Sequence, residues 1–369
     1  MKVVFFVHSI ISDWNNGHAH FLRGLVTALI RQGHEVLCCE RVRNWSTENL
    51  VQDNGVAAIV EFGRLFAQIR IKTYRGADQI IEEVDRLTQD ADLVLVHEFN
   101  EPETVSAVGY VRNRRRDFFL LFHDTHHRAA SAPDQIARLN LAHYDGVLAF
   151  GESLADIYRL HFGVHSAWVF HEAADTTVFR PLEDDKRLDM VWIGNWGDDE
   201  RSAEIYDYLI DSARLLKHLR CAVYGVRYPD EAISALADAG IIYKGWTPNF
   251  DVPRLFARAK LTIHLPRNLY RHRLPGIPTI RPFEALACGI PLISTAWADG
   301  EGLFRAGEDY LVVESPEEMR RTIVRLAEND AARARLAANG LETIRARHTC
   351  DHRAQELAEI YSELSARSA

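Results

Sequence analysis

Short apolar runs alternate with amphipathic helical patterns along the first half of the chain. Apolar runs at residues 2–8, 35–39, 57–61, 93–96, 118–122, 146–150 and 167–170 each predict a buried strand. A loop at residues 12–18 follows the first run, and a helix then extends to about Arg31 and ends before Gly33. This alternation is typical of parallel sheets covered by helices on both faces. The first half is therefore predicted to be a doubly wound α/β domain.

The pattern begins again after residues 179–186, a short charged segment that contains Pro181 and is typical of a domain boundary. Strands are predicted at residues 190–193, 221–225, 241–244 and 261–265, with a helix at 203–216. Helical patterns then continue from residue 317 to about 364, with interruptions near 329 and at 348–349. We predict Rossmann-like domains at 1–180 and 187–348, and a terminal helical segment at 349–369.

Composition agrees with two globular domains, because 369 residues with 47% apolar and 26% charged content provide for two cores. A net charge of −9 argues against a protein whose main partner is nucleic acid. Five cysteines without Cys-x-x-Cys spacing favour a reducing compartment. The first apolar run is too short for a signal peptide, and no stretch of about twenty uncharged apolar residues occurs. We expect a soluble, cytoplasmic protein without a transmembrane segment.

Residues 278–295 combine features of a phosphate site with those of a sugar site. Thr279, Ile280 and Arg281 are expected to precede a helix, and the free N–H groups and positive dipole end where that helix opens suit a phosphate. Glu284, expected in the first turn, can accept hydrogen bonds from sugar hydroxyls. In the alternative interpretation, Glu284 only caps the helix dipole and Arg281 pairs with a surface acid. The first interpretation predicts a nucleotide-sugar site.

Two more groups of the second half are candidates for the same site. The loop 194–197, which contains Asn195, follows a strand and precedes a helix, and Arg201 lies in the first turn of that helix. A cation there opposes the helix dipole, so we predict that Arg201 contacts phosphate; a surface ion pair is the alternative. Trp246 follows a strand end, where it either stacks on a base or fills the domain interior.

In the first half, polar residues follow the strands at the edge where open α/β sheets bind ligands. Gly17 and His18 lie in the loop before the first helix, and a glycine there allows close approach of a phosphate. His97 and Glu98 end one strand, and are expected to contact the acceptor or support the residues that end the next.

The next strand ends in His123, Asp124 and His126. His123 is expected to donate a hydrogen bond or transfer a proton, with Asp124 orienting it. His123, His126 and His127 also resemble zinc ligands, but their spacing matches no zinc signature, so no metal is predicted. A rim of histidines satisfied by the backbone is the other alternative. The basic run 112–116 is expected to be a solvated helix end, with an anionic acceptor or a membrane surface as the alternative.

The segment 278–295 resembles the donor-site helix of GT-B glycosyltransferases of the group-one (family-four-like) superfamily. The usual pattern there is an acid, seven residues, a second acid, then Ala-x-Ala-x-Gly-x-Pro. Glu284 matches the second acid, and Gly276 stands where the first acid is expected. The form Pro-Gly-Ile-Pro-Thr-Ile-Arg-Pro-Phe-Glu is similar to the spore-maturation-type branch. The resemblance implies a GT-B fold of two facing Rossmann-like domains, with a C-terminal helix that crosses back to the first.

The resemblance also implies a hexosyltransferase-like activity, in which a sugar moves from a nucleotide diphosphate to a glycan, lipid-linked or small-molecule acceptor with retention of anomeric configuration. No cofactor or metal is implied. The implied catalytic residues are His123 and Asp124, and the acceptor-side residues are His97, Glu98 and His126. The implied donor contacts are Gly17, His18, Asn195, Arg201, Trp246, Thr279, Ile280, Arg281 and Glu284.

Two other functions remain open from the sequence. A sugar-nucleotide epimerase would have the same fold. A non-catalytic sugar-nucleotide-binding protein is made credible by Gly276, which lacks the usual acid. A dinucleotide oxidoreductase is disfavoured, because no Gly-x-Gly-x-x-Gly follows the first strand.

Overall fold

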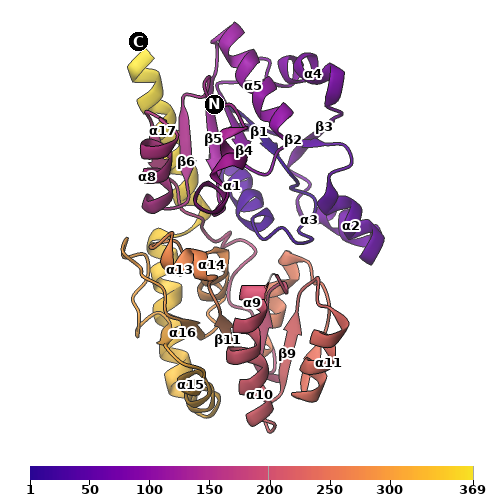
Figure 1. The fold of residues 1–369 in the computed structure, drawn as a ribbon, viewed down its shortest axis with the longest axis vertical. Helices are drawn as coiled ribbons and strands as arrows, with labels where there is room; N and C mark the ends of the chain where they lie inside the picture. Colours follow the sequence, from indigo (N-terminus) through magenta and orange to yellow (C-terminus); the bar gives the residue numbers. More distant parts are fainter. Residues whose placement is uncertain (198, 369) are drawn as a thin grey trace. The chain divides into compact units, whose positions relative to one another are not determined.

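The computed structural model describes residues 1–197 and 199–368, and the chain divides into two compact units (Figure 1). Unit 1 comprises Met1–Glu172 together with the chain from Cys350 onward, and unit 2 comprises Ala173–Thr349. The sequence predicts the division at residues 181–186. Residues 173–180 lie instead with unit 2, where the Ala174 N–H donates to the His348 carbonyl at 2.9 Å.

Unit 1 contains a parallel sheet whose seven described strands have the order β3-β2-β1-β4-β5-β6-β7. The central strands are buried along almost their whole length, which explains their continuous apolar sequence. The strand order reverses between β1 and β4, where open sheets bind ligands. The strands are β1 (Lys2–Val7), β2 (Glu35–Arg41), β3 (Arg70–Tyr74), β4 (Leu93–His97), β5 (Phe119–Asp124), β6 (Gly146–Ala149) and β7 (Ala167–Val169).

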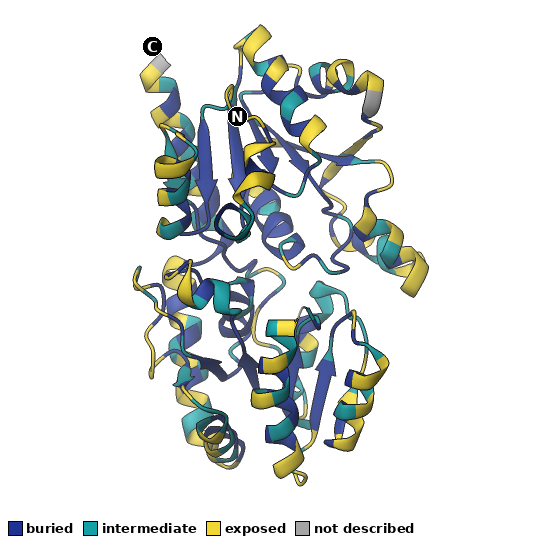
Figure 2. Ribbon diagram, in the orientation of Figure 1, coloured by how far each residue is buried: buried dark blue, intermediate teal, exposed yellow. Residues whose placement is uncertain are grey.

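Helices cover this sheet, and Figure 2 shows the buried strands beside helices whose outer faces are exposed. None of the described helices has the length and apolar character needed to cross a membrane. The helices of unit 1 are α1 (Ala19–Arg31), α2 (Trp45–Asn54), α3 (Ala57–Leu65), the 3-10 turn η1 (Ala77–Gln79), α4 (Ile80–Leu87), α5 (Pro102–Arg115), α6 (Arg128–Ser131), α7 (Pro133–Ala137), α8 (Glu152–His161) and α17 (Cys350–Ser368).

Helix α17 is the last element of the chain, yet it packs against α1 (Figure 1). Ala354 and Leu357 of α17 are fully buried, and Arg31 of α1 forms an ion pair with Asp351. The apolar contacts give α17 its position, because an exposed ion pair contributes little stability. The chain therefore contains the C-terminal crossover that the resemblance implied.

Unit 2 has a second parallel sheet, whose six described strands follow the order β10-β9-β8-β11-β12-β13. Its strands are β8 (Leu188–Ile193), β9 (Cys221–Tyr224), β10 (Ile241–Tyr243), β11 (Ala259–His264), β12 (Leu292–Thr295) and β13 (Leu311–Val313). Its helices are α9 (Asp199–Glu204), the π-helical turn η2 (Ile205–Ile210), α10 (Asp211–Leu215), α11 (Asp230–Asp238), the 3-10 turn η3 (Asn249–Asp251), α12 (Val252–Ala257), α13 (Asn268–His272), α14 (Ile280–Ala287), α15 (Pro316–Glu328) and α16 (Asp330–Arg347). Both sheets confirm the predicted fold class.

One predicted strand is wrong, because residues 57–61 belong to helix α3. The helical spacing of the larger apolar side chains explains this: Phe62 and Phe66 stack at 5.2 Å, and the buried Arg23 guanidinium lies 5.0 Å from the Phe62 ring. Strand β3 occupies the sheet edge instead. Its sequence, Arg-Ile-Lys-Thr-Tyr, carries no apolar run because only its Tyr74 end is buried.

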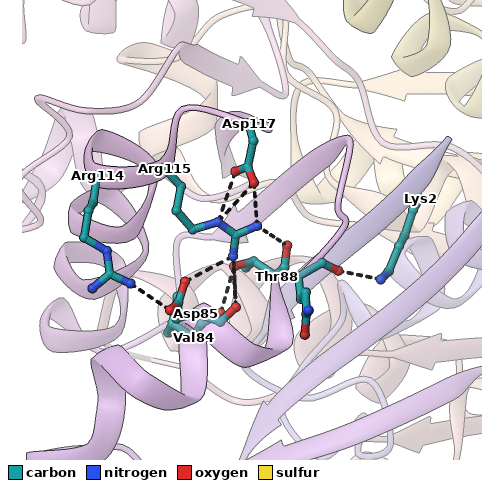
Figure 3. Close-up of polar contacts among 8 residues, drawn as sticks. Lys2, Val84, Asp85, Thr88, Arg114, Arg115 and Asp117 are labelled. Atoms are coloured by element: carbon teal, nitrogen blue, oxygen red, sulfur yellow. Dashed lines mark hydrogen bonds and ion pairs between the residues drawn. The ribbon is translucent and has the colours of Figure 1, made fainter.

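Three arginines of the basic run 112–116 are bound to acids of their own unit, and Figure 3 shows the contacts of Arg114 and Arg115. Arg115 donates to Asp85, Asp117 and Thr88, and Arg114 pairs with Asp85. Arg112 forms a two-bond contact with Asp145, at 2.9 Å for each bond. The run therefore joins the end of α5 to α4 and to the start of β6. The prediction of a solvated helix end is thus incomplete, because it did not include these ion pairs.

Candidate functional site

The beginning of α14 lies at the carboxyl edge of the unit 2 sheet. The N-cap residue is Thr279, whose side chain does not cap the helix; its hydroxyl lies 3.2 Å from His264 Nε2 instead. The backbone N–H groups at Ile280 and Arg281 are thus not used by a capping side chain. This arrangement leaves the positive end of the helix suited to an anion.

His264 was not predicted as a site residue from the sequence, although it is the polar residue that ends the buried strand β11. It is buried, and its Nδ1 lies 3.0 Å from the Ser294 hydroxyl. Burial lowers the pKa of His264 to about 3, and the nearby charges of Arg201 and Arg281 act in the same direction. The imidazole is therefore neutral, and it fixes Thr279 to the ends of β11 and β12.

Glu284 is 1% exposed and forms an ion pair with Arg281. Its predicted place in the first turn of the helix is wrong, because α14 begins at Ile280 and has no acid in its first turn. Glu284 therefore does not act as a dipole cap. Arg281 does pair with an acid, as the alternative interpretation held, but this acid is buried. A buried charge pair of this kind costs desolvation energy, so its presence requires a reason beyond helix stability.

Arg201 lies in α9, and its guanidinium donates to the Leu265 carbonyl, directly after β11. Its central carbon lies 5.6 Å from the Trp192 ring. Burial lowers the pKa of Arg201 to about 10, although the charge of Glu204 opposes this shift. The charges of both Arg201 and Arg281 act on His264, so the two guanidinium groups lie near the same strand end. These contacts argue against the alternative prediction that Arg201 forms an exposed ion pair on the surface.

Asn195 and Trp246 are the two remaining donor-side candidates of unit 2 outside the start of α14. Asn195 accepts a hydrogen bond from the Val226 N–H at 3.0 Å, so its side chain holds the loops after β8 and β9 together. Trp246 is half-buried, and its Nε1 has no hydrogen-bond partner among the described residues. Its indole is thus suited to either of the two roles predicted from the sequence.

Gly276 lies in a left-handed turn with φ of +90°. A Cβ atom at this position would lie 2.9 Å from Glu301 Oε1, and the Gly276 N–H donates to the Ala298 carbonyl at 2.6 Å. The loop after β12 therefore occupies the space next to Gly276. A side chain at residue 276 would be strained because of this left-handed φ, and the end of the Glu301 side chain would have to move to make room for it.

In unit 1, His97 ends β4 and both of its ring nitrogens are engaged. Its Nδ1 accepts from the Phe99 N–H at 3.4 Å, and its Nε2 lies 3.0 Å from the Thr125 hydroxyl. Burial, followed by the charge of His123, lowers the pKa of His97 well below its usual value. The ring is thus neutral and supports the loop after β5 rather than presenting a free nitrogen.

Glu98 follows His97 and is completely buried. Arg128 donates to its Oε2, while its Oε1 has no partner among the described residues. Burial raises the pKa of Glu98 to about 8, and the negative charge of Asp124 adds to this effect.

His123 and Asp124 end β5. His123 is 1% exposed, its Nε2 lacks a hydrogen-bond partner among the described residues, and burial lowers its pKa to about 3. The two carboxylate oxygens of Asp124 accept from the His126 N–H at 2.8 Å and from the Tyr158 hydroxyl at 2.6 Å. Both oxygens thus have partners other than His123. The expectation that Asp124 orients His123 is not met, because the strand alternation sends the two neighbouring side chains to opposite faces.

His126 packs edge-on against Phe99 at 5.1 Å and lies 4.0 Å from the ring centre of His127. Among the described residues, no group of histidine, cysteine or acidic side chains is arranged to hold a metal ion.

His18 and Gly17 precede α1, where Gly17 is exposed in a turn. His18 Nδ1 lies 2.5 Å from Glu172 Oε1, and the His18 side chain is 16% exposed. Burial opposes a charged ring, but the charge of Glu172 and its hydrogen bond outweigh burial and raise the pKa of His18. Glu172 was missed by the sequence reasoning, because 154 residues separate the two partners.

Replacing Glu172 by glutamine is expected to lower the free energy of unfolding by roughly 1–3 kcal/mol near pH 6, because the His18 cation loses a charged partner. Since the folded pKa of His18 is raised, this stabilisation is fully present below the unfolded pKa of about 6.5 and is lost as the pH rises through the folded value. Urea unfolding of both proteins at pH 6 and pH 9 measures it. An equal difference at the two pH values would contradict this account.

Comparison with known proteins agrees with this architecture. Residues 201–359 match a protein family described as glycosyl transferase-like. The Anabaena protein Alr3699/HepE, solved with UDP and glucose, superposes with a TM-score of 0.71 at 14% identity, covering 98% of this chain and 99% of that chain. TarM gives a TM-score of 0.72 at 10% identity, covering 98% of both chains. A glycosyltransferase from Rickettsia africae gives 0.69 at 12% identity, with the same coverage.

The sequence matches no curated protein. The chain thus has the GT-B fold of two parallel-sheet Rossmann-like units, and residues 201–359 are glycosyl transferase-like in sequence.

Proposed function

We propose that the chain is a nucleotide-sugar-dependent glycosyltransferase. The observation that carries this proposal is the buried pair of Glu284 and Arg281 beside the uncapped start of α14. Helix N–H groups bind the diphosphate, Arg201 and Arg281 supply positive charge, and Glu284 accepts hydrogen bonds from ribose hydroxyls. Trp246 borders the base, and Asn195 shapes the loop that faces the phosphates.

The ligands bound in the structures of similar proteins support a uridine nucleotide as the donor. HepE was solved with UDP and with UDP-glucose, and S. aureus TarM was solved with UDP and α-GlcNAc-glycerol. We therefore propose a UDP-hexose as donor and a glycan, lipid-linked or small-molecule acceptor. The segment 275–284 supports membership of the spore-maturation-type branch. The five buried cysteine thiols support a cytoplasmic location.

The chemistry follows from these charges. When the glycosidic bond to the diphosphate breaks, negative charge grows on the bridging oxygen, and Arg201, Arg281 and the α14 N–H groups stabilise it where it develops. These groups supply the positive charge that the leaving group needs, so no metal is proposed. Configuration is retained when the acceptor attacks from the face that the diphosphate leaves, and a phosphate oxygen then takes the acceptor proton.

In unit 1, Gly17 and His18 are proposed to approach the diphosphate, where the His18 cation adds charge. His123 is proposed as the catalytic residue that donates a hydrogen bond to the reacting sugar. Asp124 and His97 act as positioning residues, because they hold the His126 N–H and the Thr125 hydroxyl.

A thermal-shift panel of uridine, guanosine, adenosine and thymidine diphosphates tests this function, because a ligand that binds the folded state raises its melting temperature. We expect a selective rise with UDP in the wild type. Release of UDP from a UDP-hexose only in the presence of an acceptor would then identify transfer. An isomerised UDP-hexose without acceptor would identify an epimerase, and tight UDP binding without either reaction would identify a binding protein.

A further inference from the structure

Exposed apolar side chains gather on one short segment of unit 1. Eleven large apolar side chains of the described residues are exposed, and six of them lie within residues 42–65, on or beside α2 and α3 (Figure 2). The other five are single residues on α4, α5, α8, α10 and β10. Scattered apolar residues are normal on a protein surface, whereas a gathered group marks an interaction surface. The six residues are Val42, Trp45, Val51, Val56, Val60 and Leu65.

Helix α3 has a buried side and an exposed side. Phe62 holds the buried side against unit 1, where the Arg23 guanidinium lies 5.0 Å from its ring. Val56, at the N-cap, and Val60 are 61% and 69% exposed, and Gly63 is exposed as well. Spacings of four and then three residues place these last three on one side of the helix, which we call the α3 face.

Nothing in the described part of unit 1 requires a glycine at residue 63. Its φ is not in the left-handed region, and a Cβ atom added there would meet no atom within 4 Å. A glycine in the middle of a helix destabilises it relative to alanine, so an open position of this kind needs another reason. The missing side chain lets the backbone of a second helix approach closely, and Val56 and Val60 supply apolar surface beside it. The α3 face therefore has the form of a helix-packing surface.

The charges beside the α3 face argue against a lipid surface as its partner. Residues 42–65 contain two arginines and three acids, so they carry no excess of positive charge. Segments that bind anionic lipid are rich in lysine and arginine, and their apolar residues are mainly tryptophan, phenylalanine and leucine. The α3 face presents valine and glycine instead, which suit contact with another helix.

A second copy of the same helix matches the α3 face in shape and in charge. In an antiparallel pair with its two-fold axis between residues 60 and 63, Val60 of each helix faces Gly63 of the other, so a larger side chain meets a smaller one. Glu61 and Arg64 form an exposed ion pair at 2.5 Å beside this face. The two-fold axis brings Glu61 of one copy within one helical turn of Arg64 of the other, so opposite charges meet across the contact. Two-fold contacts are the commonest in oligomers.

We infer that the α3 face is a dimer contact, on which α3 of one copy packs antiparallel against α3 of a second copy. Helix α3 has 9 residues, whereas a standard stable interface has roughly 20–30 residues a side. The dimer is therefore reversible, and its dissociation constant lies in the micromolar range. This inference does not depend on the proposed transferase function.

Sedimentation velocity of the full chain at roughly 1 to 100 µM tests the contact. We expect a reversible equilibrium between monomer and dimer. Val60→Asp places an acid on each side of the two-fold axis and should weaken the dimer at least about tenfold. Leu160→Asp is the matched control, because Leu160 on α8 is 77% exposed and lies outside the α3 face; it should leave the dimer constant unchanged.

Gly63→Leu separates the dimer contact from a role in folding. Leucine is a better helix former than glycine and the position is open, so the melting temperature of the monomer should rise slightly. The added side chain holds the two helices apart, so the dimer should weaken about tenfold. A lower melting temperature with an unchanged dimer constant would assign Gly63 to the fold alone and overturn the inference.

Disulfide trapping measures the register of the pair. An oxidised mixture of Val60→Cys and Gly63→Cys chains should form a cross-linked heterodimer faster than either variant cross-links alone, because residues 60 and 63 face each other. The five natural cysteines are buried and should not react. Cross-linking of the mixture no faster than that of the single variants would contradict the antiparallel arrangement.

The inference is also overturned if the chain stays monomeric over the whole concentration range, or if Val60→Asp leaves the dimer constant unchanged. Vesicles of phosphatidylcholine and phosphatidylglycerol give a last comparison. Sedimentation with these vesicles that is lost in Val60→Asp, by a chain that is monomeric in their absence, would assign the surface to a membrane instead.

Discussion

Replacing Glu284 by alanine is expected to reduce the rate of sugar transfer ~10- to 100-fold and to abolish the UDP-induced rise in melting temperature. The carboxylate is 1% exposed and paired with Arg281, so its removal takes away the ribose acceptor and releases the guanidinium beside the phosphate site. Hydrogen bonds to a charged group are worth ~1.5–3 kcal/mol, and each ~1.4 kcal/mol changes a rate tenfold. Initial rates of UDP release at subsaturating donor measure the loss.

Glu308→Ala is a suitable control for this variant, because Glu308 is an exposed acid of the same unit whose pair with Arg305 has a distance of 3.4 Å. It should keep wild-type rates. Unfolding in urea separates loss of fold from loss of binding, since the Glu284 variant must retain a cooperative transition. Unchanged donor affinity in a folded Glu284→Ala protein would remove Glu284 from the proposed site.

Replacing Gly225 by alanine is expected to destabilise unit 2 by about 3 kcal/mol or more. An added Cβ would lie 2.0 Å from the Gly194 carbonyl oxygen and 2.7 Å from its carbon, and both are backbone atoms. They cannot move away freely, because the Gly194 N–H donates to the Tyr224 carbonyl at 2.9 Å and the Tyr228 hydroxyl donates to Gly194. The ends of β8 and β9 would have to separate.

Urea unfolding followed by tryptophan fluorescence measures this change, since Trp192 and Trp196 lie in the same core. Gly300→Ala is the matched control in unit 2: a Cβ there meets no atom within 4 Å, and its φ is not in the left-handed region. A Gly225 variant as stable as the control would show that the two strand ends can separate at little cost.

The sequence predicted both parallel sheets because their strands are buried on two faces and read as continuous apolar runs. The prediction was wrong at the sheet edge. There the polar strand β3 has no apolar run, whereas the helix α3 has a run of apolar residues that predicts a strand. The helix carrying Glu284 was predicted, but its start at Ile280 was not. Pro282 fits the first turn of a helix that begins at Ile280 and also of one that begins at Pro282, so the sequence does not distinguish the two starts.

The polar partners of the candidate site were the least accessible to sequence reasoning. His18 and Glu172, like His264 and Thr279, meet only after the sheet has formed, and no spacing in the chain signals such pairs. Single residues at strand ends could be proposed as candidates. Their tautomers, ion pairs and neighbours depend on three-dimensional packing.

Because α17 fills the surface of α1, the first unit to be synthesised is the last to be completed. A ribosome would release unit 2 as one continuous segment, Ala173–Thr349, whereas unit 1 is complete only when the final residues of the chain have emerged and cover α1. Truncation after Thr349 should therefore damage the part of the protein farthest from the cut in sequence. An expression fragment of the first unit needs α17 attached through a linker.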